Sequence, residues 1–314
     1  MARFVLRRVL QSAIVLVGVT LVVFLLLQLV PGDPVRVALG TRFDPQTYEA
    51  LRERAGLDQP LPVQYVSYLG HALTGDLGVS FRTGQPVSHI VLERLPATLS
   101  LAVTAVVFAL LVAFPLGIVA AVRSGSAIDH AARVFSQFGV SVPDFWMGIM
   151  GILLFAGVLG WLPPSGYVAL TDDPGRWATH VALPAVTVGL VTASILTRFI
   201  RSSVLEVLSA DYVRTAEAKG LRNRVVILRH VLRNALIPVV TVVAVQLASL
   251  LGGVIVIEVL FAWPGIGRLT FDAVQARDYP VLQGAVLLVA ALFLLVNLLV
   301  DILYARLDPR ITVK

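Results

Sequence analysis

Few side chains of this sequence are arranged for bond-making chemistry. It has no cysteine, and its five histidines form no His-Glu-x-x-His zinc motif. It also lacks the Gly-x-Ser-x-Gly sequence of a nucleophile elbow. A P-loop needs Gly-x-x-x-x-Gly-Lys-Ser/Thr, and neither lysine, Lys219 nor Lys314, stands in that sequence. The residues therefore argue against a metalloenzyme, a serine hydrolase, an intramembrane protease and an ATPase, and they call for no cofactor.

A second kind of functional residue is the polar group inside an apolar segment. Ion-driven transporters usually keep ionisable groups in mid-membrane. Here the charged residues lie near the ends of the apolar segments, and deep within them stand the neutral Gln246, Ser249 and Asn297. These three are candidate pathway-lining residues, with helix-to-helix hydrogen bonding as the alternative. We therefore expect a conduit that receives its energy from a partner.

The elements that position these residues are membrane spans. Of 314 residues, 57% are hydrophobic and 14% charged, whereas a soluble domain carries about 25% charged residues. Backbone in lipid must satisfy its own hydrogen bonds, so long apolar runs predict helices. We expect an all-α polytopic membrane protein with six transmembrane helices, at about 9–30, 96–122, 136–159, 181–200, 236–260 and 281–303. A cleaved signal peptide is the alternative for the first, but its apolar run is too long.

Basic residues predict the topology. The N-terminus, the loops 123–133 and 198–235 and the C-terminal tail carry 16 Lys/Arg, against three in the loops 161–180 and 261–280. By the positive-inside rule, both termini and the loop 201–235 should be cytoplasmic. The +6 net charge is thus explained by topology, and no nucleic acid partner is implied.

This topology divides the chain into four parts. Residues 1–30 form an N-terminal transmembrane helix, 31–95 an extracytoplasmic cap, 96–304 a transmembrane core, and 305–314 a cytoplasmic tail. Within the cap, 45–55 and 63–73 are expected to form short amphipathic helices.

The cytoplasmic loop predicts a short helix of its own. Ser209 is a plausible N-cap, residues 210–219 favour helix, and Gly220 suits the left-handed position that ends a helix. Tyr212 and Ala216 would share one face, with Val213 and Glu217 one step round. Such a helix could rest on the membrane surface or dock into a groove on a soluble partner. The loop alone leaves both alternatives open.

Here the residues carry a resemblance. The stretch Asp211-Tyr-Val-Arg-Thr-Ala-Glu-Ala-Lys-Gly-Leu221, followed by His230-Val-Leu-Arg-Asn-Ala-Leu-Ile-Pro238, resembles the coupling loop of inner-membrane permease subunits of ABC importers. It departs from the general consensus, of which only Ala216 is kept, in the manner of the dipeptide/oligopeptide branch. Further matching segments lie along the chain at 3–8, 31–34, 75–81, 94–99, 143–146, 258–268 and 307–310.

The resemblance implies a type I ABC importer permease fold in the bacterial plasma (inner) membrane. It implies a heteromeric, binding-protein-dependent importer that moves peptides by alternating access. The partners would be a paralogous permease subunit, two ABC ATPase subunits and an extracytoplasmic binding protein. Nickel chelates are an alternative substrate, and a self-sufficient facilitator or channel for small solutes is the alternative function. The residues implied in ATPase coupling are Asp211, Tyr212, Arg214, Thr215, Ala216, Glu217 and Gly220.

Overall fold

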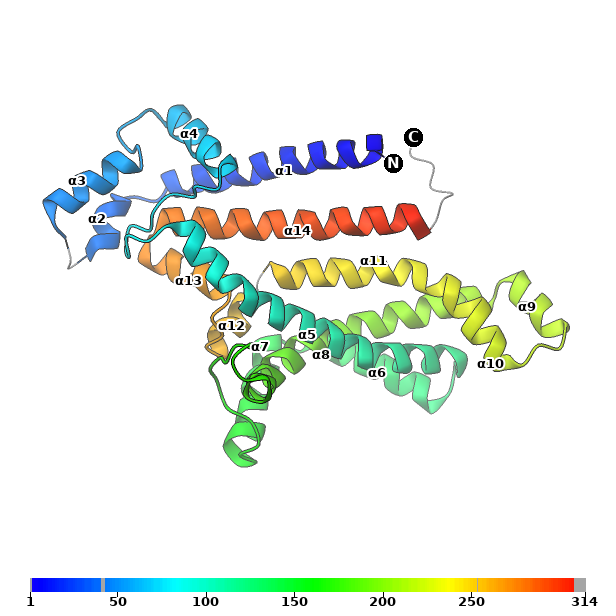
Figure 1. Cartoon of the computed structure of the whole chain (residues 1–314). Coiled ribbons are helices and arrows are strands. Elements are labelled where there is room, and N and C mark those ends of the chain that lie inside the picture. The colour runs from blue at the N-terminus through cyan, green and yellow to red at the C-terminus, as the bar shows by residue number, and fades with distance from the viewer. Residues whose placement is uncertain (1, 41–42, 253, 308–314) are drawn as a thin grey trace. The chain divides into compact units, whose positions relative to one another are not determined.

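The chain folds into helices, as its composition predicts. The computed structural model describes residues 2–40, 43–252 and 254–307. In these ranges the regular structure is helical, apart from an isolated antiparallel bridge between Val79 and Pro86. Five long helices dominate (Figure 1): α1 (Ala2–Gln28), α5 (Val87–Val122), α8 (Pro174–Leu208), α11 (Leu232–Leu251) and α14 (Tyr279–Leu307).

Shorter helices connect the long ones. They are α2 (Pro34–Leu39), α3 (Pro45–Arg54), α4 (Leu61–Leu73), α6 (Ala127–Ser141), α7 (Asp144–Gly151), α9 (Asp211–Ala218), α10 (Asn223–Val225), α12 (Ile255–Leu260) and α13 (Ile266–Ala276). Two π-helical stretches, η2 (Ile152–Val158) and η3 (Val226–Val231), follow α7 and α10. The two helices expected in the cap are confirmed as α3 and α4.

Five helices are long and apolar enough to cross a membrane, within the segments Leu6–Gln28, Val87–Val122, Pro174–Leu208, Asn223–Leu251 and Tyr279–Ile302. The span predicted at 136–159 is not one continuous helix. That region is a pair, Ala127–Ser141 and Asp144–Val158, bent by 99°. Pro143 disfavours helical backbone at the preceding residue, and Val142 is extended, with ψ at 128°. The bent pair supplies the sixth span if both arms belong to one crossing.

Two other predicted boundaries shift. The span expected at 236–260 ends at Leu251, before Gly252, and α12 is a separate helix, because glycine weakens a helix. The span expected from residue 96 begins at Val87, so α5 crosses the boundary drawn between the cap and the core.

The described residues divide into two compact units, each with its own packing. Unit 1 comprises Met1–Leu99, Leu251–Val259 and Trp263–Leu298. Unit 2 comprises Ser100–Leu250, Leu260–Ala262 and Leu299–Lys314.

Glu258 organises part of unit 1. Its side chain is buried and accepts hydrogen bonds from the Thr98 hydroxyl at 3.2 Å and the Arg268 N–H at 2.8 Å. The buried Trp263 indole donates to the Ala97 carbonyl at 2.9 Å. A Cβ on Gly265 would overlap the Glu258 carboxylate, so the turn between α12 and α13 requires glycine there. These bonds join α12 and α13 to the start of α5.

Two carboxylates, Asp278 outside the cap and Asp33 within it, bind residues of the cap. The buried Asp278 accepts from the Ser80 hydroxyl at 2.5 Å and from the Phe81 N–H at 3.1 Å. Asp33 accepts from the Tyr48 hydroxyl at 2.6 Å and caps α2 through the Arg36 N–H at 3.0 Å. Burial raises the pKa of Asp33, but these hydrogen bonds and the Arg52 charge outweigh it and hold the pKa below its ordinary value.

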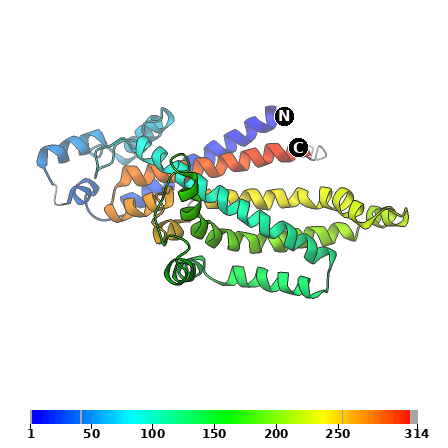
Figure 2. The same ribbon diagram turned by 60° about the horizontal axis from the view of Figure 1, so that its bottom comes forward.

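Unit 2 is built on close contact between α6 and α8, which run side by side in Figures 1 and 2. A Cβ on Gly139 would overlap the Ser194 hydroxyl, so the two helices meet where one residue has no side chain. Near the start of α6, the buried Asp129 accepts from the Arg201 guanidinium, with Nη2 at 2.9 Å, and from the Gly125 N–H at 2.9 Å. This ion pair locks the turn between α5 and α6 onto α8.

Candidate functional site

The candidate coupling helix is α9, and its start differs from the prediction. Ala210 occupies the N-cap position and offers no side-chain hydrogen bond. Ser209, the predicted N-cap, is instead the C-cap of α8 and has helical φ and ψ. Its hydroxyl donates to the Glu206 carbonyl at 2.7 Å. Assigning Ser209 as the N-cap is therefore wrong, because α8 extends further than expected.

One face of α9 is apolar and buried in unit 2. Val213 and Ala216, three residues apart, pack in a cluster with Val204 of α8 and with Val226 and Val231 of η3. The sequence predicts that Tyr212 shares a face with Ala216, and Val213 with Glu217. Tyr212 and Glu217 are exposed, so the buried stripe runs through one member of each pair. The cluster continues into α5 and α11, which couples α9 to the interior of the unit.

The opposite face of α9 is polar and exposed. Arg214 Nη1 lies 3.9 Å from Asp211 Oδ1, and both side chains are largely in solvent, so this pair contributes little stability. The Thr215 hydroxyl donates to the Asp211 carbonyl at 2.9 Å. Glu217 is exposed one turn further along the helix. These side chains form a charged surface that α9 presents outward from unit 2.

A side-chain bond fixes α9 to α11. The Asn234 amide donates to the Tyr212 hydroxyl at 3.0 Å and to the His230 carbonyl at 3.1 Å. Asn234 was not predicted as a site residue. The sequence feature that could have indicated Asn234 is its place as an amide in a largely apolar stretch, one helical turn before Pro238.

Gly220 ends α9 as predicted. Its φ is +75°, in the left-handed region, and the Leu221 N–H reaches the Ala216 carbonyl at 3.4 Å, five residues back, as in a Schellman closure. No atom lies within 4 Å of where a Cβ at this position would stand. Backbone conformation, rather than crowding, therefore selects glycine here.

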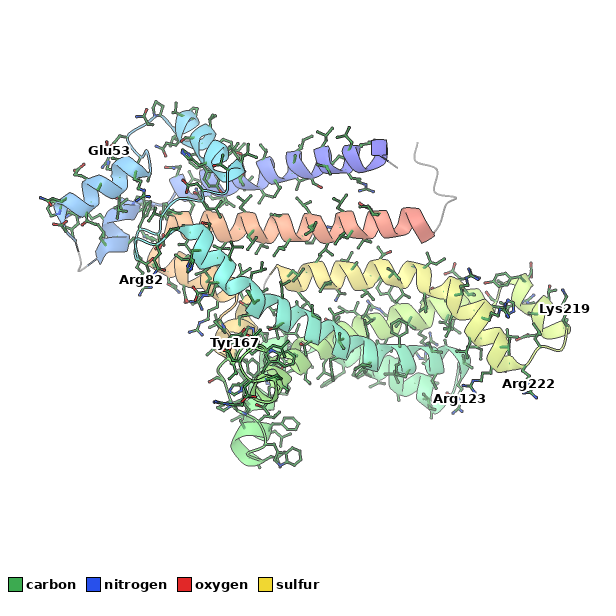
Figure 3. The ribbon with its side chains drawn as sticks, in the orientation of Figure 1. Glu53, Arg82, Arg123, Tyr167, Lys219 and Arg222 are labelled. Atoms are coloured by element: carbon green, nitrogen blue, oxygen red, sulfur yellow. The ribbon has the colours of Figure 1, made fainter. Side chains whose placement is uncertain are left out.

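Basic side chains gather at the same end of unit 2 as α9. Figure 3 shows Arg123 after α5, and Lys219 and Arg222 after α9, at this end, with Tyr167 toward the other end. The positive-inside rule predicts that this end faces the cytoplasm, and that orientation stays a prediction.

The candidate pathway residues are divided between the two units. Gln246 is half-buried and Ser249 is exposed on α11, whereas the half-buried Asn297 stands on α14 in the other unit. Their role stays a prediction. Within the described residues, no group of three His, Asp or Glu side chains is placed to hold a metal ion.

The sequence matches two families over nearly its whole length. Residues 113–313 match the binding-protein-dependent transport system inner membrane component, and residues 1–102 match the N-terminal part of such membrane components. The chain is 43% identical to the dipeptide transport system permease protein DppB of Alkalihalophilus pseudofirmus, in an alignment that covers 99% of each chain. It is 42% identical to DppB of Escherichia coli K12 and 44% identical to the glutathione transport system permease protein GsiC of Salmonella choleraesuis, each over 100% of both chains.

A solved structure shares the fold. An inward-facing structure of the MetNI methionine ABC transporter aligns with a TM-score of 0.58 at 16% identity, over 70% of this chain and 97% of that one. The apolar helices, the family matches and the full-length relatives agree. The chain belongs to the family of binding-protein-dependent transport system inner membrane components.

Proposed function

We propose that this chain is one of two permease subunits of an ATP-driven importer of short peptides. The relatives named for dipeptide and glutathione transport support the substrate class. Selection of the individual peptide would be made by an extracytoplasmic binding protein. A paralogous permease subunit would form the other half of the pathway, and both termini would be cytoplasmic.

The observation that carries the proposal is the two-sided construction of α9. Val213 and Ala216 anchor it in the core of unit 2, while Asp211, Arg214 and Glu217 stay in solvent. A helix that merely rested on lipid would turn its apolar face outward toward the membrane. Here the apolar face is already occupied, so the exposed charged face is the one left to meet a partner.

The sequence without a P-loop supports an external source of energy. We propose that two ATPase subunits dock against α9 and that closing of their nucleotide sites moves α9. The buried cluster would carry that movement into α5, α8 and α11. ATP would then be hydrolysed outside this chain.

Charge reversal at Glu217 tests the docking. In cells that express the complete transporter, Glu217→Arg should leave membrane insertion intact, abolish ATP-driven dipeptide uptake and reduce co-purification of the ATPase subunits. The matched control is Glu49→Arg on α3, where the glutamate is also exposed but lies in the cap. Normal uptake and normal co-purification in Glu217→Arg would refute docking through this face.

Reconstitution tests the source of energy and the substrate. The purified chain alone should neither bind nor hydrolyse ATP, and peptide accumulation in proteoliposomes should require the ATPase subunits. Transport by the chain alone would establish a facilitator instead. Uptake of a nickel chelate without competition from dipeptides would reject the peptide assignment.

A further inference from the structure

The cap contains a helix, α4, that packs along a transmembrane helix. The Tyr65 hydroxyl donates to the Val17 carbonyl of α1 at 2.8 Å and lies 3.1 Å from the Thr20 hydroxyl. The rings of Tyr65 and Phe24 are 5.4 Å apart, centre to centre. Thus α4 meets the side of α1 rather than its end.

These contacts fix how deep α4 lies. Val17 precedes the last residue of α1, Gln28, by eleven positions, which is about 16 Å along the helix axis. Phe24, whose ring neighbours that of Tyr65, lies about 6 Å before Gln28. The apolar sequence continues through the exposed Leu29 and Val30. Tyr65 of α4 therefore contacts α1 at levels from about 6 Å to about 16 Å before its end, within the apolar segment of α1.

The composition of α4 suits that depth. Its 13 residues contain no Asp, Glu, Lys or Arg. The neighbouring α3 contains Glu49, Arg52, Glu53 and Arg54. The two cap helices are thus built for different surroundings, α3 for water and α4 for an apolar phase.

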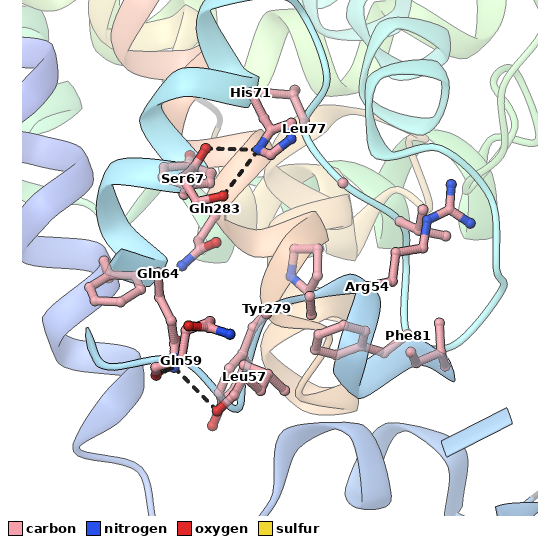
Figure 4. A pocket seen from close by; sticks show the side chains of 18 of the residues that line it. Arg54, Leu57, Gln59, Gln64, Ser67, His71, Leu77, Phe81, Tyr279 and Gln283 are labelled. Atoms are coloured by element: carbon pink, nitrogen blue, oxygen red, sulfur yellow. Dashed lines mark hydrogen bonds between the residues drawn. The ribbon is translucent and has the colours of Figure 1, made fainter. Parts of the chain in front are cut away.

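One side of α4 lines a cavity, and the opposite side is apolar and exposed. Its polar side chains Gln64, Ser67 and His71 line an inner cavity of about 400 Å³, shared with α3, the 76–81 segment and the start of α14 (Figure 4). Val66 and Leu73 point away from that cavity and are 68% and 88% exposed. A helix in water buries its apolar face. In α4, by contrast, the side away from the cavity exposes Val66 and Leu73.

We propose that α4 is embedded in the lipid leaflet around the C-terminal end of α1, with Val66 and Leu73 against acyl chains. Interfacial helices insert about 5–10 Å into the boundary between headgroups and chains. The ring contact of Tyr65 with Phe24 lies at that depth from the end of α1, and the Tyr65 hydroxyl reaches Val17 beyond it. Lipid is the occupant because α4 lies beside a helix whose own side chains, such as Leu21 and Leu25, are exposed along its length. The insertion rests on these contacts, and only the assignment to the outer leaflet rests on the proposed topology.

The absence of cysteine from the sequence allows a direct test by single-cysteine spin labelling. The variants Val66→Cys and Leu73→Cys are labelled in the assembled transporter in phospholipid vesicles. Leu25→Cys on α1 is the lipid reference, and Glu49→Cys on α3 is the water reference. Collision rates with oxygen, which concentrates in lipid, and with a water-soluble nickel complex are measured for each label.

Labels at 66 and 73 should collide with oxygen as the label at 25 does and should lose the nickel collisions seen at 49. Strong nickel collisions at 66 and 73 would place α4 in water and overturn the proposal. Protection from both reagents would place a protein partner on this face and would overturn it equally. Because the readout does not require transport, failure of the peptide-importer assignment would leave the result for α4 unaffected.

Discussion

The left-handed glycine at the end of α9 gives the sharpest prediction about coupling. Gly220 adopts a φ of +75°, and its surroundings leave open space where a side chain would stand. A substitution here is therefore opposed by backbone conformation alone. Asparagine tolerates the left-handed region, alanine is disfavoured there, and β-branched valine is disfavoured most. Asparagine and valine are similar in size, so the series separates conformation from bulk.

The magnitude follows from the left-handed backbone. An L-residue such as alanine in this conformation costs about 1–2 kcal/mol, which corresponds to a factor of about 5–30 in an equilibrium constant. Gly220→Ala should thus reduce the population of the native helix ending by up to that factor. Gly220→Val should exceed it, while Gly220→Asn should stay close to the parent protein.

The assay combines uptake with partner retention. Each variant is expressed with the other transporter subunits, its amount in the membrane is measured, and initial rates of dipeptide uptake are compared with the ATPase subunits retained after purification. At equal membrane levels, both the uptake rate and the amount of retained ATPase should decrease in the order glycine, asparagine, alanine, valine at position 220. Equal losses of uptake and ATPase retention in Gly220→Asn and Gly220→Val would show that side-chain bulk matters. Normal uptake and retention in all three variants would refute a role for this helix ending.

Further predictions concern the fold and the partners. Asp129→Asn should lower the thermal midpoint in detergent, because it leaves the Arg201 guanidinium without its ionic partner. The loss in unfolding free energy should lie near or below the lower end of about 3–5 kcal/mol, since Arg201 is 21% exposed. An unchanged midpoint would contradict the assigned pair. Tyr212→Phe and Asn234→Ala should weaken ATPase retention non-additively, because each removes the same hydrogen bond; fully additive losses would argue against that bond. Tags at both termini should be cytoplasmic and a tag within 45–60 external; termini on opposite sides would remove one span.

Local signals in the sequence predict the elements well. Long apolar runs locate five of the spans, and the glycine after a favourable helical stretch locates the end of α9. The bend before Pro143 was missed although its signal was present, since a residue before proline avoids helical backbone. The apolar content of 136–159 outweighed that signal in the prediction. Similarly, Gly252 marked the end of α11 within an unbroken apolar run.

Contacts between distant residues could not be predicted in this way. Asp129 and Arg201 are 72 positions apart, and no periodicity relates them. Tyr65 and Val17, which share a hydrogen bond, are 48 positions apart. Local sequence does not predict that bond, and residues 63–73 were therefore assigned to an external cap. The tertiary structure alone places α4 beside α1 and shows which side chains of α9 are buried.

Crosslinking from the exposed face of α9 tests the central claim most directly. A unique cysteine at Glu217 is introduced into the cysteine-free chain and labelled with a photoreactive maleimide in the assembled transporter. Irradiation should attach an ATPase subunit to this chain, and the adduct should disappear when the ATPase subunits are left out. Labelling of lipid alone, with the ATPase subunits present, would show that α9 rests on the membrane and would contradict the account.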